Sequence, residues 1–419
     1  MRSVEEQQAR VSAAAVAPRP VRVAIAEAQG LMCAEEVVTE RPLPGFDQAA
    51  IDGYAVRSVD VLGVGNSDHA EDEAAAEVSL PVMGSIEAGA RTAGRLQPRQ
   101  AVRVQTGAPL PTLADAVLPV PWTDGGQSRV RVLRAVRSGA YVRRTGDDVQ
   151  PGDVAVRAGT IIGPAQVGLL AAVGRERVLV HPRPRLSVMA VGGELVDVSR
   201  TPGPGQVYDV NSYALAAAGR DAGAEVNRIG IVSGDPRQLR DVVEGQLNRA
   251  EIVVIAGAVG GAAADAVCAV LSELGEMEVT RVAMHPGSVQ GFGQLGSEGV
   301  PTFLLPANPV SALVVFEVMV RPLIRLSLGK RQPMRRVVQA RTLSPISSVP
   351  GRKGYLRGQL MRDQDSGEYL VQALGGAPGA SSHLLATLAE ANCLVMVPSE
   401  AEQIRTGEIV DVAFLAQRG

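Results

Sequence analysis

The feature that most constrains this chain of 419 residues is an alternation of strand and helix patterns that begins near residue 183. The apolar runs 186–191, 225–232 and 252–255 are typical of buried strands, and segments with helical spacing separate them. Asp235 is placed to cap one such helix, with Pro236 at its first position, where a missing N–H costs nothing. This alternation predicts a doubly wound α/β domain with a parallel sheet and helices on both faces.

The segments on either side of that domain carry short apolar runs broken by Gly and Pro, a pattern typical of strands. Over residues 46–144 the pattern predicts a β-rich lobe, and over 331–419 it predicts a C-terminal β-barrel. Ser3-Val-Glu-Glu6 forms a capping box at the start of an expected N-terminal helix. The predicted fold class is therefore α/β plus β, in several domains.

Composition argues against several classes of protein. A net charge of −3 is unsuited to sequence-independent nucleic-acid binding, which needs a basic face. Cys33, Cys268 and Cys393 lie in neither disulfide nor zinc spacing, and they fit a reducing, cytoplasmic location. The N-terminus lacks the apolar segment of a signal peptide. The apolar run 310–320 is short and contains Glu317, so we expect a buried helix and no membrane insertion.

Three loops are expected at the carboxyl ends of the parallel strands, where open α/β sheets bind ligands. They are 192–194, 256–262 and 305–311. The Gly-rich loop 256–262 can cradle an anion with backbone amides, but its Gly and Ala residues equally suit close packing. The acidic loops 46–54 and 143–148 suit Mg²⁺, although Asp before Gly is also ordinary turn chemistry.

Separated motifs give the chain a resemblance to a known family. They occur in order at 42–57 (PLPGFDQAAIDGYAVR), 105–109, 144–148, 205–211, 305–311, 382–383 and 391–393. Together they resemble the MoeA and gephyrin E-domain family, the molybdopterin molybdenumtransferases, over essentially the whole chain. The resemblance implies an elongated subunit that forms a homodimer. Its implied parts are an N-terminal dimerisation region (1–45 and 145–180), the lobe (46–144), a molybdopterin-binding α/β domain (181–330) and the barrel (331–419).

The resemblance also implies a reaction and a set of site residues. In the family, molybdate is inserted into adenylylated molybdopterin, the adenylyl group is released, and Mg²⁺ assists. The positions that match the family's catalytic residues are Asp52, Asp148, Glu194 and Asp265, and Asp52, Glu194 and Asp265 would bind the metal. The implied substrate contacts are Thr106, Arg281, Asn308, Arg357 and Ser382, with Arg357 binding phosphate through its fork of N–H donors.

Two of the substrate loops depart from the family's pattern. The family's TGDE is Val191-Gly-Gly-Glu194 here, which lacks a hydroxyl and a carboxylate. The family's SGGxSxGxxD turn is residues 256–265 here, without either serine and with Ala258 and Ala262 in place of glycines. Gly234 also replaces the first of two aspartates after the second strand.

A third loop has lost positive charge. The family's KxxxKPGKP is residues 281–289 here, where Arg281 remains as a cation and His285 and Ser288 stand in place of lysines. Because His is mostly neutral at pH 7, one cation is left. Each lost charge-assisted bond costs on the order of 1.5–3 kcal/mol. Three or four such losses would weaken anion binding by roughly four orders of magnitude if they were additive.

Two hypotheses therefore stay open. The first is a working molybdenumtransferase, because Asp52, Asp148, Glu194 and Asp265 are all retained. The second is a gephyrin-like scaffold without catalysis that binds peptide segments of membrane or FtsZ-like cell-division partners. It rests on changes that are confined to the substrate loops, while 308–311 and the barrel keep the family's pattern.

Overall fold

The computed structural model describes the chain except residues 63, 65–76, 261–263, 376–383 and 416–419. These residues form two compact units, one of residues 1–21 and 180–419 and one of residues 22–179. Within the described residues, none of the helices combines the length and the hydropathy that crossing a membrane requires. Each unit is described separately below.

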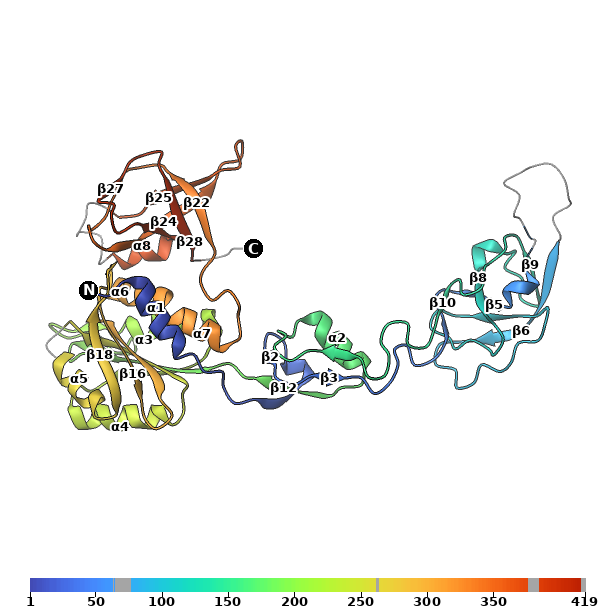
Figure 1. Ribbon diagram of the computed structural model, residues 1–419, viewed down its shortest axis with the longest axis horizontal. Helices are drawn as coiled ribbons and strands as arrows, with labels where there is room; N and C mark the ends of the chain where they lie inside the picture. Colours follow the sequence, from blue (N-terminus) through green and yellow to red (C-terminus); the bar gives the residue numbers. More distant parts are fainter. Residues whose placement is uncertain (63, 65–76, 261–263, 376–383, 416–419) are drawn as a thin grey trace. The chain divides into compact units, whose positions relative to one another are not determined.

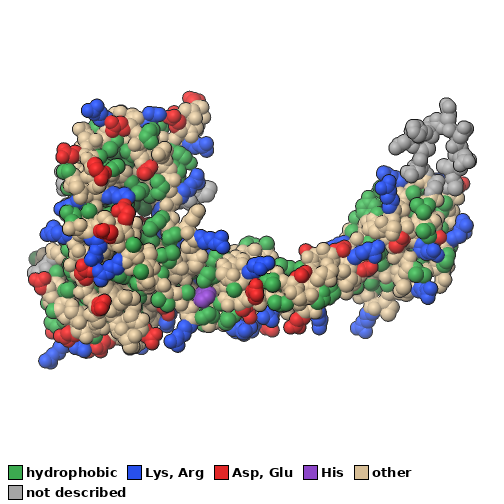
Figure 2. Space-filling model, viewed as in Figure 1, with side chains coloured by type: hydrophobic (Ala, Val, Ile, Leu, Met, Phe, Trp, Pro, Cys, Tyr) green, Lys and Arg blue, Asp and Glu red, His purple; other side chains and the backbone are tan. Residues whose placement is uncertain are grey.

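The unit 22–179 contains the β-rich lobe. Five strands form its main sheet in the order β8-β5-β7-β6-β9, with bounds β5 Gly53–Val56, β6 Val78–Ile86, β7 Ala101–Val104, β8 Ala116–Pro119 and β9 Arg129–Val132. Tyr54, Leu80 and Leu118 are fully buried in its core. Lys and Arg side chains are spread over the face of this lobe that is visible in Figure 2, and β5, β6, β8 and β9 are labelled in Figure 1.

Smaller sheets and one helix complete this unit. A three-stranded sheet has the order β1-β12-β2, and two pairs are β11-β3 and β10-β4. Helix α2 spans Pro164–Ala172, and the strand bounds are β1 Val21–Ala24, β2 Met32–Cys33, β3 Val37–Val38, β4 Gln48–Ala49, β10 Val142–Arg143, β11 Val154–Val156 and β12 Arg177–His181. Cys33 is fully buried, and burial raises the pKa of its thiol.

The other unit is built on a six-stranded sheet of order β16-β13-β17-β21-β20-β18. The bounds are β13 Arg185–Val191, β16 Glu225–Val232, β17 Ile252–Val259, β18 Gly275–Arg281, β20 Val289–Leu295 and β21 Val300–Pro306. The first four strands in the order are parallel, which confirms the predicted α/β domain. Strand β20 is antiparallel to both β21 and β18, so β18 runs in the same direction as the parallel strands.

Helices cover both faces of this sheet (Figure 1). On one face, α3 (Asn211–Ala222), α6 (Pro309–Val315) and α7 (Arg321–Ser327) pack against Leu186 and Val254. On the other face, α4 (Pro236–Leu247) and α5 (Ala264–Ser272) pack against Met189 and Ile255. The π-helical turn η4 (Phe316–Val320) joins α6 to α7, so the apolar run near 310–320 is a buried helix, as predicted.

Two caps predicted from the sequence are present. The Asp235 carboxylate accepts hydrogen bonds from the backbone N–H groups of Arg237 (3.1 Å) and Gln238 (3.0 Å) at the start of α4. Helix α1 (Val4–Ala13) begins with the predicted capping box, in which the Ser3 hydroxyl accepts from Glu6 N–H (3.1 Å) and the Glu6 carboxylate accepts from Ser3 N–H (2.9 Å). Both caps satisfy backbone N–H groups that have no partner within the helix.

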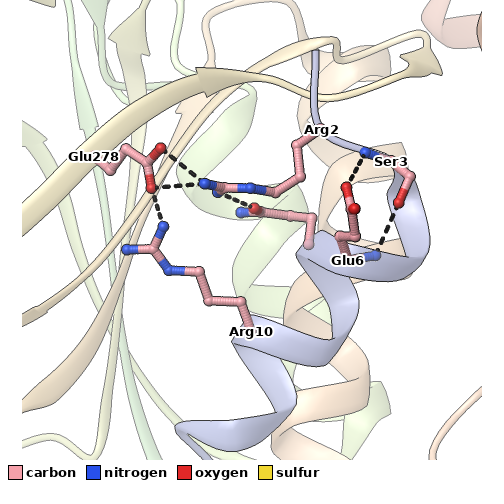
Figure 3. Close-up of polar contacts among 6 residues, drawn as sticks. Arg2, Ser3, Glu6, Arg10 and Glu278 are labelled. Atoms are coloured by element: carbon pink, nitrogen blue, oxygen red, sulfur yellow. Dashed lines mark hydrogen bonds and ion pairs between the residues drawn. The ribbon is translucent and has the colours of Figure 1, made fainter.

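One carboxylate of the α/β domain contributes to the attachment of helix α1. Figure 3 shows that Glu278 of β18 accepts from the guanidinium of Arg2 (2.9 Å) and from that of Arg10. Arg2 also donates to Gln7 (2.8 Å), which is buried. The first helix therefore packs with residues 180–419, while the division into four functional parts stays a prediction.

The C-terminal region contains the predicted β-barrel. Strands β24-β25-β22-β28-β26 follow one another, and an additional β24–β26 pairing closes the ring. Their bounds are β22 Val337–Thr342, β24 Lys353–Arg362, β25 Tyr369–Ala373, β26 Cys393–Val397 and β28 Ile409–Phe414, with the short α8 at Leu385–Glu390. Strand β19 (Met284–His285), from the α/β domain, pairs with β24 and joins the two domains. Burial raises the pKa of Cys393 in the barrel core to about 12.

Gly257 and Gly260 allow a stability prediction, because both have left-handed backbones, at φ +82° and +80°. A Cβ on Gly257 would overlap the Val191 carbonyl oxygen, whereas a Cβ on Gly260 would meet open space. Gly260→Ala should therefore cost about 1–2 kcal/mol of unfolding free energy. Gly257→Ala should cost about 1–3 kcal/mol more, because the neighbouring strand must shift. Urea denaturation of the two variants measures the difference, and equal losses would contradict the proposed close approach.

Candidate functional site

The carboxyl ends of β13, β17 and β21 lie at one edge of the α/β sheet because these strands are parallel neighbours. The three predicted loops follow these strand ends, so one edge receives Glu194, the turn at Gly257–Gly260 and Asn308. Strand β18 runs in the same direction, and it therefore brings Arg281 to that edge as well. This is the edge at which open α/β sheets bind ligands.

The turn at the end of β17 depends on its glycines. Gly257 is left-handed and lies against the Val191 backbone, so no other residue fits there without strain. Ala258 is fully buried in the core between the sheet and α4 and α5, and its φ is not positive. The Ala258 Cβ therefore does not stand at a left-handed position. Ala262, the other substituted glycine, lies outside the described residues.

Two candidate carboxylates lie on this side of the sheet. Both Glu194 and Asp265 are exposed, and Asp265 is in the first turn of α5. The Glu194 carboxylate folds over Gly192, where a Cβ would stand 2.8 Å from one of its oxygens. A larger residue at 192 would displace the carboxylate, so the missing side chain of Gly192 leaves the space that the carboxylate occupies.

Asn308 caps α6, where its side-chain oxygen accepts from the backbone N–H of Ser311 (3.0 Å). The preceding carbonyl, that of Ala307, accepts from the side chain of Asn211 (2.7 Å) at the start of α3. The loop after β21 is thus held by two asparagines. This geometry gives Asn308 a structural task, and its role in substrate binding stays a prediction.

The hairpin after β18 has little charge of its own. Burial and, secondarily, the nearby charge of Arg352 lower the pKa of His285, so this ring is neutral at pH 7. The Ser288 hydroxyl donates to the Val282 carbonyl (2.9 Å). Arg352 was not predicted from the sequence. It is brought to the hairpin by a long-range pairing, in which His285 of β19 is the partner of Gly354 of β24.

Arg357 lies in the barrel strand β24 and is 5% exposed. One of its guanidinium nitrogens donates to the Leu384 carbonyl (2.7 Å), and burial lowers its pKa. A buried guanidinium next to this carbonyl is a strong candidate for pairing with an anion, but the structure does not test its predicted phosphate contact. Ser382, the other predicted contact in this region, lies outside the described residues.

In the lobe, Asp52 and Thr106 are in direct contact. One Asp52 oxygen accepts from both the backbone N–H and the hydroxyl of Thr106, each at 2.8 Å. The backbone bond first, and the hydroxyl second, lower the pKa of this exposed carboxyl group, so it is ionised at neutral pH. The structure thus joins two predicted site residues that lie far apart in sequence.

Asp47 repeats this arrangement and was missed from the sequence. It accepts from the backbone N–H (2.8 Å) and hydroxyl (2.9 Å) of Thr145, and these bonds lower its pKa. Its presence in the motif 42–57, with a threonine in the motif 144–148, was the available signal. Asp148 follows on the same segment, is exposed, and donates its backbone N–H to the Leu43 carbonyl (3.0 Å).

The predicted metal ligands do not gather within either unit. Asp52 belongs to the unit 22–179, and Glu194 and Asp265 belong to the other. In the part of the chain that the structure describes, no group of three His, Cys, Asp or Glu side chains could hold a metal ion. Mg²⁺ binding therefore stays a prediction.

Comparison with known proteins identifies the family of this arrangement. Residues 2–174 match a family model described as the MoeA N-terminal region (domain I and II), residues 187–326 a probable molybdopterin binding domain, and residues 339–415 the MoeA C-terminal region (domain IV). The chain is 86% identical to molybdopterin molybdenumtransferase 1 of Mycobacterium tuberculosis (strain CDC 1551 / Oshkosh), with 100% of both chains covered. It is 37% identical to molybdopterin molybdenumtransferase 2 of the same strain, covering 98% of this chain and 99% of that protein.

The fold agrees with these sequence matches. A crystal structure of a molybdopterin biosynthesis MoeA protein from Pyrococcus horikosii has a TM-score of 0.81 and 30% identity, with 99% of each chain covered. The parallel sheet, the closed barrel and the lobe described above are therefore found together in a relative of similar length. The chain belongs to the MoeA family of molybdopterin molybdenumtransferases.

Proposed function

We propose that this chain transfers molybdenum from molybdate to adenylylated molybdopterin, with release of the adenylyl group. The observation that carries the proposal is the sheet edge to which parallel strands bring the Gly257–Gly260 turn, Glu194 and Arg281. Backbone amides in such a turn bind phosphate without a charged side chain. That property matters here, because His285 is neutral and Ser288 bonds to a carbonyl.

The carboxylates complete the proposed chemistry. Exchange of molybdate oxygens for dithiolene sulfurs needs protons to be delivered to the leaving oxygens, which is a task for acid–base groups. Asp52 is held ionised by Thr106 and can accept a proton or bind a cation. Because the fit of Mg²⁺ rests on residues of separate units, no step is assigned to the ion. The proposed homodimer would let the lobe of one subunit serve the sheet edge of its partner.

Expression in a strain that lacks its own molybdenumtransferase tests this function through nitrate reductase activity. The wild-type chain should restore activity, at a level below that of a family member with the full set of lysines. Asp52→Asn should abolish the restoration while the purified protein still binds molybdopterin with an affinity within about twofold of wild type. No restoration by the wild-type chain at normal expression would reject the proposed reaction.

Thr106 allows a pH prediction. Thr106→Val removes the hydroxyl bond to Asp52 and keeps the backbone bond, so the lowered pKa of Asp52 should rise part of the way to its ordinary value. Because the ionised form is the active one, the acid limb of kcat/KM should move to higher pH. Thr106→Ser keeps the hydroxyl and is the matched control. An acid limb that is identical in both variants would assign it to another group.

The missing lysines give a prediction on affinity. His285→Lys combined with Ser288→Lys should raise the affinity for molybdopterin at low salt by roughly tenfold or more, as expected for one charge-assisted bond. The gain should shrink as salt screens the added charges. The family's pattern has a serine at position 260, but Gly260→Ser is not added to this variant. A side chain would be strained at the φ of +80° that Gly260 adopts.

Calorimetric titration at two salt concentrations measures this gain. Ser288→Ala is the control, since it breaks the same hydrogen bond to Val282 and adds no charge. If the double variant binds no better than this control, the edge does not contact the phosphate groups.

A groove beside α1 favours a second candidate function, the peptide-binding scaffold. It has a volume of about 390 Å³ and lies between the start of α1, the hairpin residue Ala283 and the barrel. Met396 and Pro398 give its lining apolar surface, and Glu5, Glu400 and Asp411 give it carboxylates, with Lys353 paired to Glu5 at 2.9 Å. Carboxylates exceed cations in this lining. We propose that the groove accepts an extended peptide with an apolar residue, which would lie on Met396 and Pro398, next to a basic residue, which would face the carboxylates.

A panel of amidated hexapeptides that pair one Phe or Leu with one Arg tests the groove. Asp411→Asn should weaken the best peptide by roughly twofold to fivefold, through loss of a charge pair at an exposed carboxylate. Glu244→Gln, an exposed carboxylate on α4, is the control and should change nothing. Binding that is the same in both variants would place the peptide elsewhere.

A further inference from the structure

A cavity in the lobe lies outside both proposed sites. It has a volume of about 390 Å³, which is within the range of small-molecule pockets. Its walls are Trp122, Tyr141, Arg134 and Arg137 together with small apolar residues. None of the described residues that line it is a carboxylate, so its described lining combines aromatic surface with two guanidinium groups.

The aromatic wall is organised by specific contacts. The rings of Trp122 and Tyr141 meet edge to face, with centroids 5.7 Å apart. The Arg134 guanidinium lies 4.2 Å above the centre of the Trp122 ring, a cation–π geometry. A guanidinium fixed over a ring leaves its N–H groups directed around its rim, where they can bind an anion.

The backbone of Tyr141 supports a specialised role. Its φ is +58°, which is uncommon for a residue with a large side chain. The Tyr141 carbonyl accepts from Ala50 N–H (2.9 Å), and its ring contacts Trp122, so the surrounding structure holds the strained conformation. Strain of this kind concentrates at ligand sites.

We propose that this cavity binds a small anion built on a planar ring, of the nucleoside monophosphate class. The ring would stack in the aromatic wall, and the phosphate would bind Arg134 and Arg137. A phosphate alone would lack the stacking surface, and an uncharged ring would leave both guanidiniums without a partner. This inference does not depend on the proposed reaction at the sheet edge.

Trp122 provides the measurement, because it is the chain's one tryptophan. Its fluorescence is titrated with AMP, adenosine and inorganic phosphate, with excitation at the red edge, where adenine does not absorb. AMP should give a saturable change, and adenosine and phosphate should each bind at least roughly tenfold more weakly. Asp52→Asn should leave the AMP titration unchanged, which separates this site from the proposed active site.

Arg137→Gln should weaken AMP by roughly tenfold, whereas Arg91→Gln, an exposed lobe arginine outside the cavity, should not. Circular dichroism of both variants verifies that they fold. A linear response to AMP, equal binding of adenosine, or an unchanged Arg137→Gln variant would overturn the proposal. So would a saturable response to an acidic peptide with none to AMP, because the cavity would then be a protein-binding surface.

Discussion

The parallel register of β13, β17 and β21 is the constraint on which the rest of the site depends. It brings three strand ends to one edge, and there the backbone of Gly257 lies against the carbonyl of Val191. Such an approach needs a residue without a Cβ and with a left-handed φ. The turn at Gly257–Gly260 can then present its backbone amides to a ligand beyond the end of the neighbouring strand β13. Glu194 and Asn308 gain their positions from the same register, since each follows one of these strands.

This dependence on backbone explains how the family's fold persists while its side chains change. A substitution removes the charge of a lysine side chain. The backbone amides at a strand end remain in any sequence that keeps the strand register. The chain has lost lysines at 285 and 288 and both serines of the turn, but it has kept Gly257. Two cations come from separate elements: Arg281 ends β18, and Arg352, which directly precedes β24, lies near His285.

Local signals in the sequence were sufficient for most of the elements. The run 225–232 coincides with β16, the cap at Asp235 begins α4, and the pattern after residue 331 is a barrel. Helix α3 ends at Ala222, directly before the left-handed Gly223, and glycine commonly ends a helix in this position. Long-range contacts were not predictable in this way. Glu278 has no sequence feature that marks it as the carboxylate for Arg2 and Arg10. Likewise, the contact of Asp47 with Thr145 joins residues that are 98 positions apart.

The hairpin that follows β18 connects the two functions proposed for the unit 1–21 and 180–419. Ala283 lines the peptide groove, accepts a backbone hydrogen bond from Lys353 (2.9 Å) and donates one to Arg2 (2.8 Å). Two residues later, His285 pairs with β24 close to Arg352. A peptide in the groove would therefore lie beside the segment that carries Arg281 and His285. Any coupling between the two sites would be reciprocal, with each ligand changing the affinity for the other by the same factor. The enzyme and scaffold hypotheses are thus not exclusive alternatives, because one hairpin forms part of both surfaces.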